Sequence, residues 1–401
     1  MDLHTKNIFL QTCNTLSIEQ VVEVIKSGNV NIDELKEAGL ADSKIQLILN
    51  IIFSANSKSE QKSEKEKFVN QISKGRTKAE EIINKLNQGI ISLDDLEDLK
   101  DSGCISTKVI RAIKHSQANI NNITPFRDVT QLPPMETGRT DLYFIGVPGS
   151  GKSTMLSGIL QCAHKSGSLM PDPYNQDGVK FQNKLLQDFN NGVLPKATAE
   201  GSYNYIALSL RGDDEKRHPF NIVDVPGEVF NQIIDNPKVD DFLHYIHNSN
   251  RKIIVFVIDS LAHDNGYTDS RNQNDQSLIY PNILQLLHSH GVLEQTDAIY
   301  LVANKFDAIY QSRYQGDDRA HKEIAYEFLN DEFLNLINNC KAVREDTKNQ
   351  FKIKILPFSI GKVAFETIFD YYDQTYSANI LSEIIGDSFV VKGGKWTKFF
   401  S

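Results

Sequence analysis

The stretch that decides the fold is residues 146–154, which read GVPGSGKST. An apolar run, Leu142–Ile145, precedes this stretch, and a helix-like run, Met155–Leu160, follows it. In such a strand–turn–helix unit, backbone N–H groups of the glycine-rich turn converge on phosphate oxygens, and the helix N-terminus adds the positive end of its dipole. Lys152 would reach the β- and γ-phosphates, and the Ser153 hydroxyl would be a Mg²⁺ ligand. The pattern therefore predicts a site for a nucleoside triphosphate without specifying its base.

A second motif, Asn304-Lys305-Phe306-Asp307, follows the strand-like run Ala298–Ala303. Guanine offers two donors, its ring N1–H and its exocyclic amine, so a fixed carboxylate such as Asp307 can accept from both. Adenine presents an acceptor at the ring position, and Asp307 therefore argues against an ATPase. Asn304 is expected to hold neighbouring loops together, and the aliphatic stem of Lys305 is expected to cover one face of the base. The motif predicts guanine.

A third motif lies at the end of the apolar run Phe220–Val223, where Asp224 and Gly227 have the spacing D-x-x-G. We expect Asp224 at the edge of the sheet, where it can hold a water of the Mg²⁺ shell. Because glycine is small, the N–H of Gly227 can approach the γ-phosphate and so distinguish GTP from GDP.

With these motifs in this order, residues 138–375 resemble the translation-factor-related class of P-loop GTPases, which includes Ras-like proteins, Era-like proteins and the bacterial double-GTPase families. The resemblance implies an α/β domain, a mostly parallel sheet with helices on both faces, that binds GTP or GDP together with Mg²⁺. It also implies a final guanine loop, which we place at residues 359–362, read as SIGK, after the strand-like run Ile353–Leu356. Ser359 and Ile360 are its predicted nucleotide contacts.

Proteins of this class close a switch I threonine over Mg²⁺ and the γ-phosphate. We assign this role to Thr198, because no other threonine lies between Thr154 and the strand-like run Tyr205–Leu210. An ordinary exposed loop threonine is the alternative. The preceding insertion, residues 166–200, would then form an enlarged switch I whose conformation depends on the γ-phosphate, and an effector would bind there.

Glu228 stands where Ras-like proteins have a water-orienting glutamine. An ionised glutamate can only accept hydrogen bonds, and its charge would face the γ-phosphate. Intrinsic hydrolysis is therefore expected to be slow, unless Glu228 acts as a base or points elsewhere. No arginine lies between Thr154 and Arg211, so an arginine finger in cis is not expected. Gly149 stands where potassium-activated relatives carry asparagine, which argues against activation by potassium. Acceleration is expected from a protein activator or from a second copy of the chain in a homodimer.

These motifs give three sets of site residues. The residues predicted to bind the nucleotide are Gly146, Pro148, Gly149, Ser150, Gly151, Lys152, Ser153, Thr154, Asp224, Gly227, Asn304, Lys305, Asp307, Ser359 and Ile360. The residues predicted to act in catalysis are Lys152, Thr198, Gly227 and Glu228. The residues predicted to hold the metal are Ser153, Thr198 and Asp224.

The N-terminal third contains a weak repeat, in which residues 21–52 resemble residues 82–113. Each copy reads as short helices separated by glycine, and the second helix of each opens after Asn31 or Ser92 as its N-cap. The predicted domains are helical module 1 at 1–53, a polar linker at 54–75, helical module 2 at 76–116, a second linker at 117–137 and the GTPase domain at 138–401. Residues 54–67 read either as a mobile linker or as the frayed start of a helix. The modules are expected to bind a protein partner; a helical extension that only stabilises the GTPase is the alternative.

Composition narrows the class of protein. The net charge of −9 argues against a general nucleic-acid-binding surface, and a hydrophobic content of 40% is enough to form a core. The four cysteines are widely spaced and are expected to be reduced thiols. No apolar run reaches the roughly 18 residues of a membrane span, and the N-terminus lacks a signal-peptide pattern. We therefore expect a cytoplasmic protein without a transmembrane segment.

The function expected from the sequence is that of a molecular switch that binds GTP and hydrolyses it to GDP and phosphate. Effectors or activators would bind through the switch regions and the N-terminal helical modules. The alternative is a nucleotide-sensing adaptor with negligible hydrolysis, for example in a bacterial regulatory or defence assembly, in which Glu228 marks lost catalysis.

Overall fold

The structure is a computed structural model that describes residues 3–118, 125–195, 202–212, 215–230, 237–263 and 276–388. It divides into two compact units, Met1–Ile105 and Ser106–Ser401, and each is described by itself. Within the described residues, no helix is long and apolar enough to cross a membrane.

The first unit is helical. Its helices are α1 (Leu3–Thr12), α2 (Ile18–Lys26), α3 (Ile32–Glu37), α4 (Asp42–Ser73), α5 (Ala79–Asn87) and α6 (Leu93–Asp101). Apolar side chains of α2, α3 and the start of α4 form a core with Cys13, and this core includes Val21, Leu35 and Ile48. Burial of this shared apolar face is the main force that holds such short helices together, because isolated helices of this length are marginal in water.

The two copies of the repeat have the same local structure. Asn31 and Ser92 are the N-caps of α3 and α6, as the sequence predicts, and the structure shows that each also forms a capping box with the acidic residue three positions later. Gly28 and Gly89 follow α2 and α5 with φ of +71° and +69°, a conformation that favours glycine. The repetition is therefore visible in caps and turns as well as in the sequence.

The predicted polar linker, residues 54–75, lies for most of its length in α4, which runs to Ser73. Its lysine, glutamate and glutamine residues have high helix propensity, so a solvated helix and a solvated loop share this composition. The predicted second module, residues 76–116, extends into α7 (Thr107–Ala118), which is grouped with the second unit. Residues 119–124 of the second predicted linker lie outside the described residues. The domain boundaries remain predictions.

The second unit is an α/β domain. Its strands are β1 (Thr140–Ile145), β2 (Leu169–Pro171), β3 (Asn204–Arg211), β4 (Arg217–Asp224), β5 (Arg251–Asp259), β6 (Thr296–Asn304), β7 (Lys352–Phe358), β8 (Gly361–Ala364) and β9 (Ile368–Tyr372). Its α-helices are α7, α8 (Lys152–Lys165), α9 (Gln176–Asn190), α10 (Pro237–Ile246), α11 (Gln276–Ser289), α12 (Phe306–Arg313), α13 (His321–Glu332), α14 (Leu334–Asp346) and α15 (Gln374–Asp387). Short 3-10 helices are η1 (Val129–Gln131), η2 (Gly227–Phe230), η3 (Ser260–His263) and η4 (Val292–Gln295).

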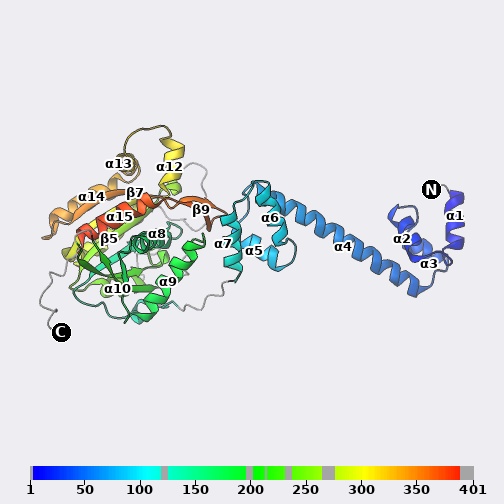
Figure 1. Cartoon of the computed structure of the whole chain (residues 1–401), viewed down its shortest axis with the longest axis horizontal. Helices are drawn as coiled ribbons and strands as arrows, with labels where there is room; N and C mark the ends of the chain where they lie inside the picture. The colour runs from blue at the N-terminus through cyan, green and yellow to red at the C-terminus, as the bar shows by residue number, and fades with distance from the viewer. Residues whose placement is uncertain are drawn as a thin grey trace. The chain divides into compact units, whose positions relative to one another are not determined.

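The large sheet has the strand order β2-β3-β4-β1-β5-β6-β7. The strands from β4 to β7 are parallel, and β2 and β3 add an antiparallel edge. Strands β5 and β6 are apolar along almost their whole length, which is typical of parallel strands covered on both faces. Helices of this unit surround the strands (Figure 1). The predicted fold class, a mostly parallel sheet with an N-terminal helical extension, is confirmed.

A separate two-stranded sheet, formed by β8 and β9, connects three parts of the second unit. Strand β8 begins within the predicted guanine loop, at Gly361, so the last two residues of that loop lie in a strand. The hairpin also bonds to the segment before residue 196, because Leu194 N donates to Thr367 O (2.8 Å) and Phe369 N donates to Gly192 O (2.9 Å).

Helix α7 is attached to the same hairpin. Ser106 Oγ donates to Asp370 Oδ1 (2.6 Å), and Lys108 Nζ donates to the Asp370 carbonyl (3.1 Å). At the other end of α7, His115 Nε2 lies 3.0 Å from Asp188 Oδ1 of α9. These bonds fix α7 between the hairpin and the insertion that leads to the predicted switch I.

Candidate nucleotide-binding site

The carboxyl ends of the parallel strands bring the sequence motifs to one edge of the sheet. Phe144 of β1 pairs in register with Asp224 of β4, and Asp259 of β5 pairs with Asn304 of β6. Asn304 is in turn level with Phe358 of β7, directly before the predicted guanine loop. Open α/β sheets bind ligands at this edge, so the topology places the predicted residues where a nucleotide site is expected.

The glycine-rich loop after β1 contains two glycines in the left-handed backbone conformation. Gly149 and Gly151 have φ of +79° and +89°, and α8 begins at the next residue, Lys152. A Cβ on Gly151 would collide with the Asn304 side chain. Glycine is therefore required at this position both by the backbone conformation and by the close approach of the guanine motif.

Lys152 points into the loop. Its side chain is buried, with 6% of the residue exposed, and Nζ donates to the carbonyls of Gly146 (2.7 Å) and Val147 (3.3 Å). The loop carbonyls hold the ammonium in one place, where it can attract the phosphates of a nucleotide.

Two of the residues predicted to hold the metal, Ser153 of the phosphate loop and Asp224 of the D-x-x-G motif, are in contact. Ser153 Oγ donates to Asp224 Oδ2 (3.0 Å), and Asp224 is almost fully buried. A hydroxyl beside a carboxylate is an oxygen donor set that suits Mg²⁺, which keeps several waters and takes its other ligands from phosphates. Among the described residues, no group of three His, Cys, Asp or Glu residues could hold a metal ion. Thr198 lies outside the described residues.

The buried hydroxyl of Ser150 also fits an anionic ligand in the loop. Its Oγ has no hydrogen-bond partner within the part of the chain that the structure describes, and the residue is fully buried. A buried hydroxyl without a partner is costly, and a phosphate oxygen would supply the acceptor.

Gly227 touches the phosphate loop. A Cβ built on Gly227 would lie 2.5 Å from Pro148 N and 2.8 Å from Gly146 O. Only glycine allows this close approach of two backbones. Glu228 follows in η2, and its side chain lies outside the part that the structure describes.

The guanine motif is joined to the phosphate loop by Asn304. Its Nδ2 donates to the Ser150 carbonyl (2.5 Å), and its Oδ1 accepts from Lys305 N (2.8 Å). Lys305 has a left-handed φ of +57°, which turns the chain from β6 into α12. Asn304 therefore bonds the guanine motif to the phosphate loop, and its role at a bound nucleotide stays a prediction.

The Asp307 carboxylate is hydrogen-bonded to the predicted guanine loop after β7. Ser359 Oγ donates to Asp307 Oδ1 (2.7 Å), and Gly361 N donates to Ser359 Oγ (3.1 Å). The Ile360 side chain packs towards Gly158 of α8, so a contact of Ile360 with the base would come from its backbone. Ser359 orients the carboxylate that is expected to select guanine.

Sequence reasoning missed Asp259, the last residue of β5. Its Oδ2 forms an ion pair with Lys305 Nζ at 2.7 Å, and Asp259 is fully buried. The sequence contains part of the signal, because Asp259 ends a long apolar run as Asp224 does, but no motif spacing connects it to Lys305.

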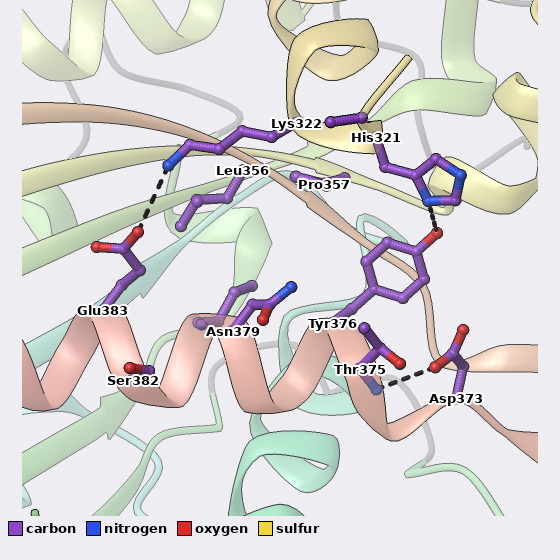
Figure 2. Close-up of a pocket in the computed structure, with 12 residues that line it drawn as sticks. His321, Lys322, Leu356, Pro357, Asp373, Thr375, Tyr376, Asn379, Ser382 and Glu383 are labelled. Carbon is purple, nitrogen blue, oxygen red and sulfur yellow. Dashed lines mark hydrogen bonds and ion pairs between the residues drawn. The ribbon is translucent and has the colours of Figure 1, made fainter. Parts of the chain in front are cut away.

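A cavity of about 600 Å³ lies between α13 and α15, beside the edge strand β7 (Figure 2). Two pairs span it: Lys322 Nζ lies 3.5 Å from Glu383 Oε1, and His321 Nδ1 lies 2.7 Å from Tyr376 OH. Burial raises the pKa of Tyr376 to about 12, so its phenol remains protonated at neutral pH. The cavity contains none of the residues predicted to bind the nucleotide.

The sheet, the phosphate loop after β1 and the N-K-x-D motif after β6 define a P-loop protein of the Ras-like GTPase class. The family model for Double-GTPase 2 matches residues 142–354, more than half of the chain, and the chain belongs to this family. Membership implies that the domain binds guanine nucleotides and works as a GTP-binding switch.

Among solved structures, the chain is similar to one from the signal recognition particle receptor SRb-GTP/SRX complex of Chaetomium thermophilum. The two are 11% identical, the match covers 63% of this chain and 100% of that chain, and the TM-score is 0.35. No curated protein matches the sequence.

Proposed function

We propose that this chain hydrolyses GTP to GDP and phosphate and thereby acts as a molecular switch. The main support is the bond from Asn304 Nδ2 to the Ser150 carbonyl, which joins the base-reading motif to the phosphate loop. Lys152 inside the loop and Asp307 held by Ser359 lie on the two sides of this junction. A single guanine nucleotide that reaches both sides explains why these motifs meet.

In the proposed reaction, a water oxygen attacks the γ-phosphorus while the bond to the β–γ bridging oxygen breaks, which gives GDP and phosphate. Lys152 and the N–H of Gly227 would stabilise the charge that develops on the phosphoryl oxygens. Mg²⁺, when bound, neutralises charge on the β- and γ-phosphates. Ser153 and Thr198 are proposed as its direct ligands, and Asp224 is proposed to hold one of its waters.

Intrinsic turnover is proposed to be slow because Glu228 replaces the water-orienting glutamine of Ras-like proteins. A carboxylate cannot donate a hydrogen bond to the attacking water, and its charge opposes that of the γ-phosphate. A protein activator or a second copy of the chain would then supply the missing group. Light scattering in the presence of a GTP analogue tests the second of these sources.

Phosphate release from GTP by the purified full-length chain tests the proposed reaction. Lys152→Ala should abolish release, whereas Lys165→Ala, at the exposed end of the same helix, should leave it unchanged. Excess ATP should not compete; competition by ATP would overturn the assignment of guanine. Tight GTP binding without release, alone or at dimer-forming concentrations, would favour the adaptor function.

We also propose that protein partners bind the N-terminal helical modules and the insertion at 166–200. The paired capping boxes support two related helical modules, and α9 gives the insertion a folded surface. Hydrogen exchange of residues 166–195 should differ between the GDP form and the GTP-analogue form. Equal exchange in both forms would contradict a switch role for this segment.

A further inference from the structure

Asp259 holds the lysine of the guanine motif through a buried ion pair. Its carboxylate has no exposed surface; Oδ2 lies 2.7 Å from Lys305 Nζ, and Oδ1 accepts from Leu261 N at 3.2 Å. The Lys305 side chain is only partly covered, with 27% exposed. Lys305 is therefore tied at its charged end while its aliphatic stem remains accessible.

The backbone of Asp259 is also fixed by a side chain. Gln276, almost fully buried, accepts from Asp259 N through Oε1 (2.8 Å) and donates to Asp259 O through Nε2 (3.1 Å). A two-point amide contact of this kind leaves the end of β5 little freedom to rotate. Asp259 thus presents its carboxylate from a fixed position.

The same network reaches the phosphate loop. Tyr280 OH lies 3.0 Å from Gln276 Oε1 and 2.8 Å from the Val257 carbonyl, and it accepts from Val147 N at 3.4 Å. Burial raises the pKa of Tyr280, so its hydroxyl remains protonated. Residues from the guanine motif to the phosphate loop are therefore linked by buried side chains as well as by Asn304.

The backbone at Lys305 needs such support. Its φ of +57° lies in the left-handed region, which residues other than glycine, asparagine and aspartate seldom adopt. Lys305 N is held by Asn304 Oδ1, and Lys305 Nζ is held by Asp259. Strained residues persist where their surroundings determine them at several points, and they gather at binding sites.

We propose that Asp259 is a positioning residue for guanine-nucleotide binding, whose buried carboxylate holds Lys305 so that the lysine stem lies over the base. The inference rests on the proposed guanine site. It assigns to Asp259 an effect that passes through Lys305 and through no direct contact with the nucleotide. The two residues should therefore act on affinity as one unit.

A double-mutant cycle tests this assignment. GDP affinity is measured for the full-length chain, Asp259→Asn, Lys305→Met and the double variant. Each single change should weaken GDP binding by about tenfold, because Asp259→Asn removes the charge that holds Lys305, and Lys305→Met removes the ammonium that is held, so that the aliphatic stem is no longer anchored in either variant. In the Lys305→Met background, Asp259→Asn should cause no further loss. Additive losses in the double variant would overturn the proposal, as would unchanged affinity in Asp259→Asn.

Asp141→Asn is the matched control for a general loss of stability. Asp141 is also fully buried, but it lies at the start of β1, at the opposite end of the sheet, where it accepts from Asn221 and Asn250 side chains (2.8 and 2.9 Å). This variant should lower the melting temperature and leave GDP affinity unchanged. If the unmodified chain binds no GDP, the proposed function fails; if it binds and the cycle is additive, only the role of Asp259 fails.

Discussion

Asn304 uses both ends of its amide within the site. Nδ2 donates to the Ser150 carbonyl and Oδ1 accepts from Lys305 N, at 2.5 and 2.8 Å. Neither a carboxylate nor an ammonium could make this pair of bonds, because one only accepts and the other only donates. At the residue scale, the phosphate loop and the guanine motif are therefore joined by Asn304, and a displacement of one should displace the other.

Gly227→Ala tests whether the D-x-x-G turn must touch the phosphate loop. A Cβ would lie 2.5 Å from Pro148 N, and a backbone atom cannot move away as a side-chain end can. We expect GTP-analogue affinity to fall by about tenfold or more, as measured by titration with a fluorescent analogue. Gly386→Ala is the matched control, because a Cβ there meets open space in α15; it should be neutral or slightly stabilising. Unchanged affinity in Gly227→Ala would contradict the close contact.

At the element scale, the strands that end in motifs could be predicted from the sequence, because each is an apolar run followed by a chemically distinctive residue, as at Asp224 and Asn304. Asp259 could not be assigned a role in this way, since a single carboxylate carries no spacing that points to Lys305; only the strand order β5-β6 brings them together. Helix α4 was hidden for a different reason. Residues 54–67 of this helix have a polar composition that helices and loops in water share, and no apolar stripe marks this part.

The β8–β9 hairpin is another element that the sequence did not predict, and it joins α7 to the guanine loop. Asp370→Ala removes the acceptor of Ser106 Oγ and should loosen α7, because Ser106 directly precedes the helix and its Oγ accepts from Val109 N of the first turn. We expect faster hydrogen exchange in residues 107–118, by roughly fivefold for a loss of about 1 kcal/mol. Asp318→Ala, at an exposed turn, should leave this exchange unchanged. Equal exchange in Asp370→Ala and the unmodified chain would mean that α7 is held by other contacts.

The opposite end of the sheet contains a buried charge that should make stability depend on pH. Lys252 at the start of β5 is fully buried, and Nζ donates to the carbonyls of Asn248 (2.9 Å) and Asn250 (2.7 Å). Burial lowers the pKa of Lys252 to about 8, while Asp141 opposes the shift and Arg251 adds to it. In the unfolded chain, the same group keeps its ordinary pKa of about 10.5.

Between pH 8 and 10.5 the unfolded chain therefore binds more protons at Lys252 than the folded chain does, so this group makes folding more favourable as pH rises through that window. Lys252→Met removes the dependence. The stability of the unmodified chain relative to Lys252→Met should increase by up to about 3 kcal/mol across the window, as measured by urea unfolding at a series of pH values. A constant difference would show that Lys252 has an ordinary pKa in the folded state.

At the scale of the whole molecule, every described residue of the proposed nucleotide site belongs to the second unit, Ser106–Ser401. A ligand that binds only the folded form of this unit stabilises it by about 2.7 kcal/mol at a free concentration 100 times its Kd. We therefore expect calorimetry of the full-length chain to show two transitions, of which only the one from the second unit shifts upward with GDP and Mg²⁺. Limited proteolysis during heating assigns each transition to its unit. ADP is the control and should shift neither transition. If GDP shifts both transitions together, the helical unit unfolds with the nucleotide domain, and the helical modules then act on the switch through folding as well as through partner binding.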